Sequence, residues 1–322
     1  MCANQSGLPH SKTWRNHCAI ASGSAAVLCR FPIPPQRHLP GILNAMKINY
    51  RTPITKFCVL LAVCSSAAHI TPHRAEASEP LRALLITGGC CHDYNAQKRL
   101  LTEGISARAN VTWTIIHEGD ADGKDHRFSI YEKPDWATGF DVVVHNECSG
   151  TVSNAAWVEH IAQAHFEGVP AVVIHCSIHS YRWSTTDEWR KLLGVSSYQH
   201  QTRRPFAVVN LKPEHPVMKG FPAKWLDDPD ELYEIKKVWP DCTPLAEALT
   251  PIKETDKHPC IWVNTYGKAR VFGTTLGHGN ETMQREVYLD LVTRGLLWAC
   301  DKLDEDGKPK AGYGKKSSAK AE

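Results

Sequence analysis

Histidines follow several short apolar segments of the chain, and imidazole is the side chain best suited to proton transfer and metal binding near neutral pH. His175 and His179 come directly after the apolar residues 171–174, with Cys176 between them. A spacing of four residues suits two ligands of one metal ion, or a general acid and base. The alternative is a pair of hydrogen-bonded structural histidines beside a buried, inert thiol. We expect catalytic roles for His175 and His179, and include Cys176 as a catalytic candidate with the inert thiol as its equal alternative.

Two further histidines lie in loops that contain glycine. His92 follows Gly88-Gly89-Cys90-Cys91, and His278 lies between two glycines. Glycine lets the backbone come close to a ligand. Together with His175, these histidines are our candidate ligands for one divalent, Zn-like metal ion, although an exposed loop histidine is the alternative for His92. No nucleotide cofactor is expected, because the loop has neither the G-x-G-x-x-G nor the Walker spacing.

Glu147 is another polar residue that follows a largely apolar segment, 140–145, and it lies close to His145 in the sequence. A carboxylate in this position can act as a general base or a metal ligand. Its alternative is a solvent-exposed acid, the usual state of a glutamate. We expect Glu147 to be the catalytic partner of His175 or His179.

Apolar segments and helical stretches alternate in the first half of the chain. The predicted strands cover residues 81–87, 111–117, 140–145 and 171–175, and the predicted helices cover 95–107 and 153–166. This alternation predicts an α/β fold, with parallel strands and helices on both faces of the sheet. In such a sheet, ligands bind beyond the carboxyl ends of the strands. We therefore expect the histidines at these ends to converge.

The second half is less regular. We expect a strand over 207–210, a hairpin of 261–266 and 269–274, and a closing helix over 285–300. Residues 302–322 are rich in Lys, Gly and Ser, which predicts a disordered tail. Cys242 and Cys260 flank one excursion of the chain and are our candidate disulfide pair.

The residues before Ser78 have the features of an export signal. Basic residues after Met46 precede an apolar run over 57–68, and Ala75-Glu76-Ala77 fits an A-x-A cleavage site. The run is shorter than the roughly 20 residues of a membrane-spanning helix, so we expect no transmembrane segment in the mature chain. We predict a signal peptide over 46–77, with lipidation at Cys64 as the alternative, and a periplasmic or extracellular location. Residues 1–45 are predicted to be a mis-called or disordered extension.

The distribution of charge excludes one class of partner. The chain carries a net charge of +3, but residues 1–77 carry +7, which leaves −4 for residues 78–322. A protein that binds nucleic acid needs a basic surface on its folded domain. We therefore expect no nucleic-acid partner.

Four segments follow one another in the order Ile174–Trp183, Glu214-His215-Pro216-Val217, Asp230-Glu231-Leu232-Tyr233, and 266–272 continuing to Thr275-Leu276-Gly277-His278. The ordered set resembles the ThuA-like (trehalose-utilisation) family of the class I glutamine amidotransferase-like superfamily. It covers residues 81–301, so we take 78–301 as the domain. The resemblance implies a flavodoxin-like three-layer sandwich with a mostly parallel central sheet, and a role in carbohydrate utilisation.

The same segments contain side chains that suit a sugar. An acid and a phenol can hold hydroxyl groups, and an aromatic ring can stack on a sugar. Our candidates for substrate binding are Trp183, Arg182, Glu231, Tyr233 and His278, with His200 in support. Class I amidotransferases use a G-x-C-x-G elbow. In this chain His175 occupies the elbow and no glycine lies between Ala171 and Trp183, so we expect no glutamine amidotransferase activity.

The leading hypothesis is an exported, metal-assisted hydrolase or isomerase that acts on a sugar or an oxidised sugar derivative in a crevice lined by His and Glu. One alternative is a non-catalytic carbohydrate-binding or accessory module. Another is residual amidase chemistry at Cys176. A small carbohydrate is the expected ligand in the first two cases, and a homo-oligomer is compatible with the sequence.

Overall fold

The computed structural model describes residues 78–119, 123–250 and 256–316. The predicted extension over 1–45 and the predicted signal peptide over 46–77 lie outside the described residues. Within the described part of the chain, no helix is both long enough and apolar enough to cross a membrane.

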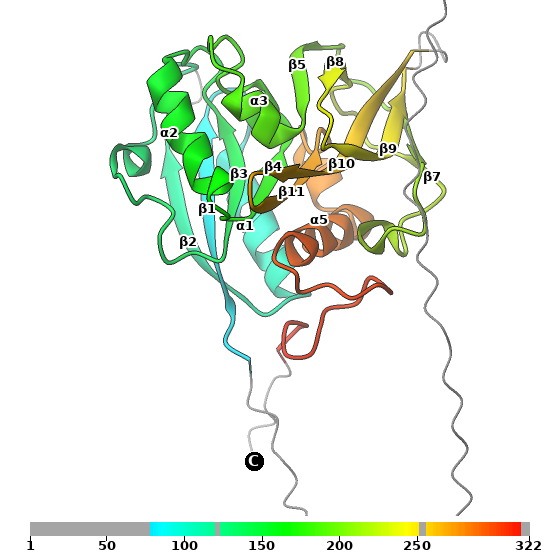
Figure 1. Ribbon diagram of the computed structural model, residues 1–322. Coiled ribbons are helices and arrows are strands. Elements are labelled where there is room, and N and C mark those ends of the chain that lie inside the picture. The colour runs from blue at the N-terminus through cyan, green and yellow to red at the C-terminus, as the bar shows by residue number, and fades with distance from the viewer. Residues whose placement is uncertain (1–77, 120–122, 251–255, 317–322) are drawn as a thin grey trace, which may run out of the picture. The chain divides into compact units, whose positions relative to one another are not determined.

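Five parallel strands form one half of the main sheet (Figure 1). In their order across the sheet they are β2 (Val111–Glu118), β1 (Leu81–Gly89), β3 (Val142–Cys148), β4 (Ala171–Ile174) and β11 (Ala269–Thr274). β3 and β4 are buried along their whole length, which explains the apolar residues 142–144 of β3 and the wholly apolar β4. Because these strands are parallel, their carboxyl ends lie along one edge of the sheet.

Four antiparallel strands extend the sheet beyond β11. They are β10 (Lys257–Tyr266), β9 (Thr243–Leu249), β6 (Ala207–Asn210) and β7 (Lys224–Leu226). β10 and β11 form the hairpin that the sequence predicts, and β6 has the predicted bounds. A separate antiparallel pair consists of β5 (Val195–His200) and β8 (Tyr233–Val238).

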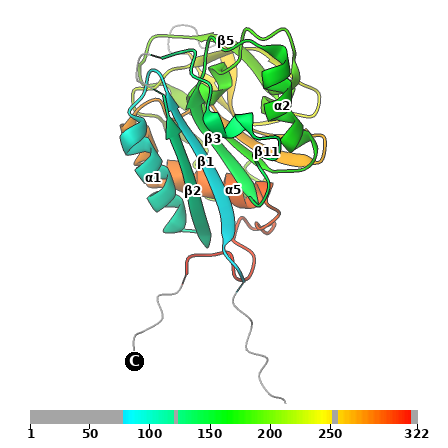
Figure 2. The same cartoon turned by 90° about the vertical axis from the view of Figure 1, so that its left-hand side faces the viewer.

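Helices cover both faces of the main sheet, which gives the domain three layers (Figures 1 and 2). α1 (Tyr94–Ser106) and α5 (Glu286–Ala299) pack on one face, and α2 (Ala155–Phe166) and α3 (Glu188–Leu193) on the other. The short helices are η1 (Ser129–Glu132), η2 (His175–His179), η3 (Pro216–Met218) and α4 (Asn280–Met283). The predicted flavodoxin-like α/β fold is confirmed.

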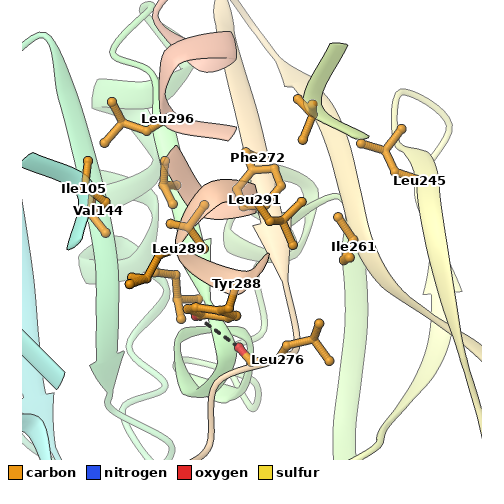
Figure 3. Close-up of a cluster of buried hydrophobic side chains, with 14 of the residues drawn as sticks. Ile105, Val144, Leu245, Ile261, Phe272, Leu276, Tyr288, Leu289, Leu291 and Leu296 are labelled. Atoms are coloured by element: carbon orange, nitrogen blue, oxygen red, sulfur yellow. Dashed lines mark hydrogen bonds between the residues drawn. The ribbon is translucent and has the colours of Figure 1, made fainter. Parts of the chain in front are cut away.

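Apolar side chains of α5 form the centre of the core on the face of the sheet that α1 and α5 cover (Figure 3). Leu291 and Leu296 are fully buried, as is Phe272 of β11. Each such side chain contributes about 1.5–3 kcal/mol through its removal from water. Tyr288 donates a hydrogen bond to the carbonyl oxygen of Leu276 at 3.4 Å. This core therefore anchors the loop that follows β11.

Two features differ from the sequence predictions. Cys242 and Cys260 are free thiols that pack in the cores on opposite faces of the sheet, so they do not form the expected disulfide. The disulfide of the described residues joins Cys90 to Cys91. In the predicted tail, Tyr313 packs against the core, and its carbonyl oxygen accepts a hydrogen bond from the Asn110 amide at 3.0 Å. Residues 317–322 lie outside the described part.

Candidate functional site

Three histidines converge where the loops after β1, β4 and β11 meet. The ring centres of His92 and His175 are 5.0 Å apart, those of His92 and His278 are 4.6 Å apart, and those of His175 and His278 are 5.3 Å apart. One nitrogen of each ring lies within 4.8 Å of the others, so the group could hold a metal ion. These are the three residues that the sequence nominates as metal ligands, and the parallel strands bring them together.

Backbone carbonyl groups orient two of these rings. His175 Nδ1 donates to the carbonyl oxygen of Thr275 at 2.6 Å, and His92 Nδ1 lies 3.3 Å from the carbonyl oxygen of His278. A carbonyl oxygen only accepts, so each Nδ1 carries a proton, and in the neutral ring the lone pair is on Nε2. This is how proteins commonly fix the tautomer of a metal-binding histidine.

Glu231 places a carboxylate against the same cluster. Its Oε2 lies 3.4 Å from His175 Nε2, 3.2 Å from His278 Nδ1 and 3.5 Å from the Nε2 of His200. His175 Nε2 and His278 Nδ1 are buried, and neither makes a well-aligned hydrogen bond among the described residues. Buried polar atoms of this kind point to a ligand. The sequence nominates Glu231 as a sugar contact, whereas its position also suits a metal ligand.

The charges at the cluster favour a cation. Burial, reinforced by His175 and His278, lowers the pKa of His92 to about 3. Burial acts to lower the pKa of His175 as well, but the carboxylates of Glu231 and Asp230 outweigh it and raise that pKa. For Glu231 burial acts to raise the pKa, and the contacts with His175 and His278 outweigh it and lower that pKa. The site thus presents a neutral imidazole beside an ionised carboxylate.

Asp230 fixes the loop that carries His278. Its side chain is fully buried and accepts backbone hydrogen bonds from Gly277 at 2.7 Å, from His278 at 3.1 Å and from Glu231 at 2.7 Å. On the other side, Gln97 Nε2 donates to the His278 carbonyl oxygen at 3.1 Å. Neither Asp230 nor Gln97 is among the site residues predicted from the sequence. Gln97 could have been found, because it is a polar residue on the buried face of α1, between Tyr94 and Leu101.

The elbow residue between β4 and η2 has a strained backbone. His175 has a φ of +42°, in the left-handed region that residues other than glycine rarely adopt. Such strain is often kept at functional sites. Cys176 is buried behind it, and its hydrogen bond with Cys148, together with burial, raises its pKa well above the usual value. The side chain at the elbow is therefore an imidazole, and the thiol that follows it is buried.

Residues 82–299 match the ThuA family, which is described by trehalose utilisation. The chain belongs to the ThuA family. A putative ThuA-like protein from Parabacteroides merdae ATCC 43184 superposes with a TM-score of 0.57 at 19% identity, over 74% of this chain and 98% of that one. One from Bacteroides uniformis ATCC 8492 gives 0.53 at 16%, again over 74% and 98%. At these identities the structures show a shared fold. None of the curated proteins matches the chain.

In this ThuA domain His179 does not join the histidine cluster. Its Nε2 lies 3.0 Å from the hydroxyl oxygen of Ser197, and its ring stacks on Tyr233 with centres 4.0 Å apart. Burial, with the charge of Arg182 and of neighbouring histidines, lowers the pKa of His179 to about 2. Tyr233 is itself buried and its other neighbours include His175 and His200. His179 and Tyr233 therefore form a stacked pair beside the histidine cluster, and His179 is not one of its candidate metal ligands.

Glu147 belongs to a different network. Its carboxylate is fully buried, accepts a hydrogen bond from the Tyr131 hydroxyl at 3.0 Å and lies 2.8 Å from His145 Nδ1. His145 continues through its Nε2 to the Nε2 of His165 at 3.0 Å. The carboxylate beside His175 is that of Glu231, so the predicted pairing of Glu147 with His175 is replaced by Glu231.

Arg182 and Trp183 lie beside β5. Arg182 donates to the carbonyl oxygen of Tyr198 at 3.2 Å, and its guanidinium lies 5.6 Å from the centre of the Trp183 ring. The Trp183 side chain is 57% exposed. An exposed indole ring can stack on a sugar, so the predicted role of Trp183 stays a prediction.

A surface pocket of about 450 Å³ opens beside His92 and His278 and is also lined by Cys91, Arg203 and Glu281. A larger pocket of about 990 Å³ lies at the amino ends of β1, β3 and β4, and none of the described residues that line it is a histidine. Ligands of open α/β sheets bind at the carboxyl ends of the strands. We therefore regard the smaller pocket as the entrance to the candidate site.

Proposed function

We propose that this ThuA-family protein is a metal-assisted enzyme that acts on a sugar or an oxidised sugar derivative. One divalent, Zn-like cation would be held by His92, His175 and His278. The observation that carries the proposal is the convergence of three imidazole nitrogens within 4.8 Å of one another. Neutral imidazole is a common ligand of such cations. The link of the family to trehalose utilisation supports a carbohydrate as the substrate.

Each residue of the site has a distinct task. His92 and His175 offer Nε2 to the cation, because their Nδ1 atoms face carbonyl oxygens. Glu231 would complete the ligand set or take a proton from the substrate, since it stays ionised. His200, whose side chain is 38% exposed, lies 3.5 Å from Glu231 and can pass that proton to solvent. A bound cation would polarise a sugar carbonyl or lower the pKa of water.

A non-catalytic carbohydrate-binding role is the second candidate. The observation in its favour is that Glu147 and His179, both nominated as catalytic, are buried and engaged with other protein groups. Fewer side chains are therefore available as a general acid or general base than the sequence analysis nominates. Calorimetric binding of disaccharides with no turnover would favour this candidate.

The test is elemental analysis of the full chain and of His92→Ala and His175→Ala. We expect about one equivalent of a divalent metal in the wild type and a loss in both variants. His160→Ala is the matched control, because His160 lies on α2 and bonds to the Lys133 carbonyl oxygen. Turnover of disaccharides and their oxidised derivatives is then measured. Wild-type metal content and activity in His175→Ala would overturn the proposal.

We also propose that the protein is exported to the periplasm or beyond. The support is the basic and apolar pattern over 46–77 with its A-x-A site. Amino-terminal sequencing of protein recovered from cells should give Ser78 as the first residue. Recovery of an uncleaved chain from the cytoplasm would contradict the proposal.

A further inference from the structure

Four cysteines lie together next to the histidine cluster. Cys90 and Cys91 form a disulfide, and the Sγ of Cys90 lies 3.4 Å from the Sγ of Cys148. Cys90, Cys148 and Cys176 pack with Tyr94 in a small buried core of their own. Neither the ThuA assignment nor the proposed metal chemistry uses these sulfur atoms.

A thiol this close to a disulfide is placed to react with it. Exchange begins when a thiolate attacks one sulfur of a disulfide, and it ends when the other sulfur leaves. Cys148 faces Cys90, which makes Cys91 the leaving group. We propose that Cys90, Cys91 and Cys148 form a thiol–disulfide exchange unit, in which Cys148 attacks Cys90 and releases the thiol of Cys91 beside His92.

The step needs no external oxidant or reductant. The bond between Cys90 and Cys91 breaks, and a bond between Cys148 and Cys90 forms. The electron pair of the broken bond stays on the Sγ of Cys91, which takes up the proton that Cys148 loses. The three cysteines share one disulfide and the same number of protons before and after the exchange.

The surroundings of Cys148 suit an attacking group. A hydrogen bond from Cys176 lowers the pKa of Cys148, against the opposing effect of burial. The Sγ of Cys148 also lies 3.4 Å from the Sγ of Cys90, within reach of the disulfide. A thiolate, not a thiol, is the nucleophile in exchange. Among the described cysteines, Cys300 is free and partly buried near Asp141, and burial raises its pKa to about 12.

The product differs from the starting form at the entrance to the site. Cys91 is the exposed member of the group, and it lines the same pocket as His92 and His278. In the vicinal disulfide its sulfur is engaged, whereas after exchange it carries a free thiol next to His92. The exchange thereby adds or removes a soft ligand at the candidate site.

Alkylation of the folded full chain traps the product. Iodoacetamide is added under non-reducing conditions, and the sample is then quenched with acid and digested with trypsin. Trypsin leaves Cys90 and Cys91 on peptide 83–98, and Cys148 and Cys176 on peptide 128–182. We expect these peptides to become disulfide-linked while Cys91 acquires one carbamidomethyl group. In Cys148→Ser the rate of linkage should fall at least about tenfold, because the attacking sulfur is absent.

Two variants control the experiment. Cys300→Ser removes a cysteine far from the cluster in sequence and should link at the wild-type rate. Cys176→Ala retains the attacking sulfur, so the two peptides should still link, which identifies Cys148 even if Cys148→Ser fails to fold. The proposal is overturned if the wild type yields only the vicinal disulfide or only free thiols. It is equally overturned if linkage in Cys148→Ser proceeds at the wild-type rate, or if linkage disappears in Cys176→Ala.

Discussion

Asp230→Asn tests whether the candidate site depends on the loop that carries His278. In the wild type one carboxylate oxygen accepts from the amides of His278 and Glu231, and the other accepts from the amide of Gly277. Asparagine has nearly the same shape but a single acceptor oxygen. Its best orientation keeps two of these hydrogen bonds and turns an NH₂ group towards Gly277.

The expected cost follows from that count. One hydrogen bond to a charged, buried acceptor is lost, and a buried N–H is left without a partner, which together cost about 2–3 kcal/mol of unfolding free energy. The loop would then shift, and with it His278 and Glu231. Loss of a residue that positions metal ligands typically weakens metal binding by roughly 10–100-fold. We expect both effects in Asp230→Asn.

Urea unfolding at neutral pH measures the first effect, and zinc titration in competition with a chelator measures the second. Asp141→Asn is the matched control, because Asp141 pairs with the 59% exposed side chain of Arg82 at the other end of the strands. Surface pairs of this kind contribute about 1 kcal/mol or less. The reasoning is refuted if Asp230→Asn unfolds within about 0.5 kcal/mol of the wild type and binds zinc equally well.

Three further predictions concern single side chains. Glu231→Gln keeps the shape but removes the charge between His175 and His278, so the same competition assay should show zinc affinity at least about tenfold lower. Burial, then the charge of Asp230, raises the pKa of Asp227 from 3.8 to about 9. The native state therefore holds an extra proton between those values, and wild-type stability should fall by up to about 1.4 kcal/mol per pH unit as pH rises through that window. Asp227→Asn should flatten this slope in urea unfolding compared at about pH 5 and about pH 8, and an unchanged slope would rule out Asp227 as its source. Trp183→Ala should leave unfolding within about 0.5 kcal/mol of the wild type but weaken disaccharide binding in calorimetry, and unaltered binding would exclude the stacking role.

The parallel half of the fold could be predicted because its strands are buried. β4 and the first three residues of β3 appear in the sequence as apolar runs, and the bounds of both strands differ from the predictions by only a few residues. β8, by contrast, contains one Glu and two Lys and is mostly exposed at its far end. Such a strand forms because β5 pairs with it, and this contact between distant residues leaves no periodic signal in its own sequence.

Ligands of parallel sheets bind beyond the carboxyl ends of the strands. This rule predicted the edge of the sheet at which the candidate site lies, but not the face of the sheet to which each side chain points. Side chains alternate along a strand, so Asn146 and Glu147 point to opposite sides. Asn146 bonds to Gln97 of α1, whereas Glu147 bonds to Tyr131 in the core on the other face. His179 was misplaced for a related reason. η2 is a 3₁₀ helix with three residues per turn, so residues four apart do not share a face as they do in an α-helix.

The loop from Gly88 to His92 makes the histidine and cysteine clusters one unit. A Cβ at Gly89 would lie 2.2 Å from the carbonyl oxygen of Cys148, so only glycine lets this loop pack against β3. That packing brings Cys90 to Cys148 and places His92, two residues later, against His175. Exchange of the disulfide must move Cys91, whose φ is +84°. The adjacent His92 must then move with it. If the state of the disulfide changes cation affinity, thermodynamic linkage requires the cation to shift the exchange equilibrium by the same factor.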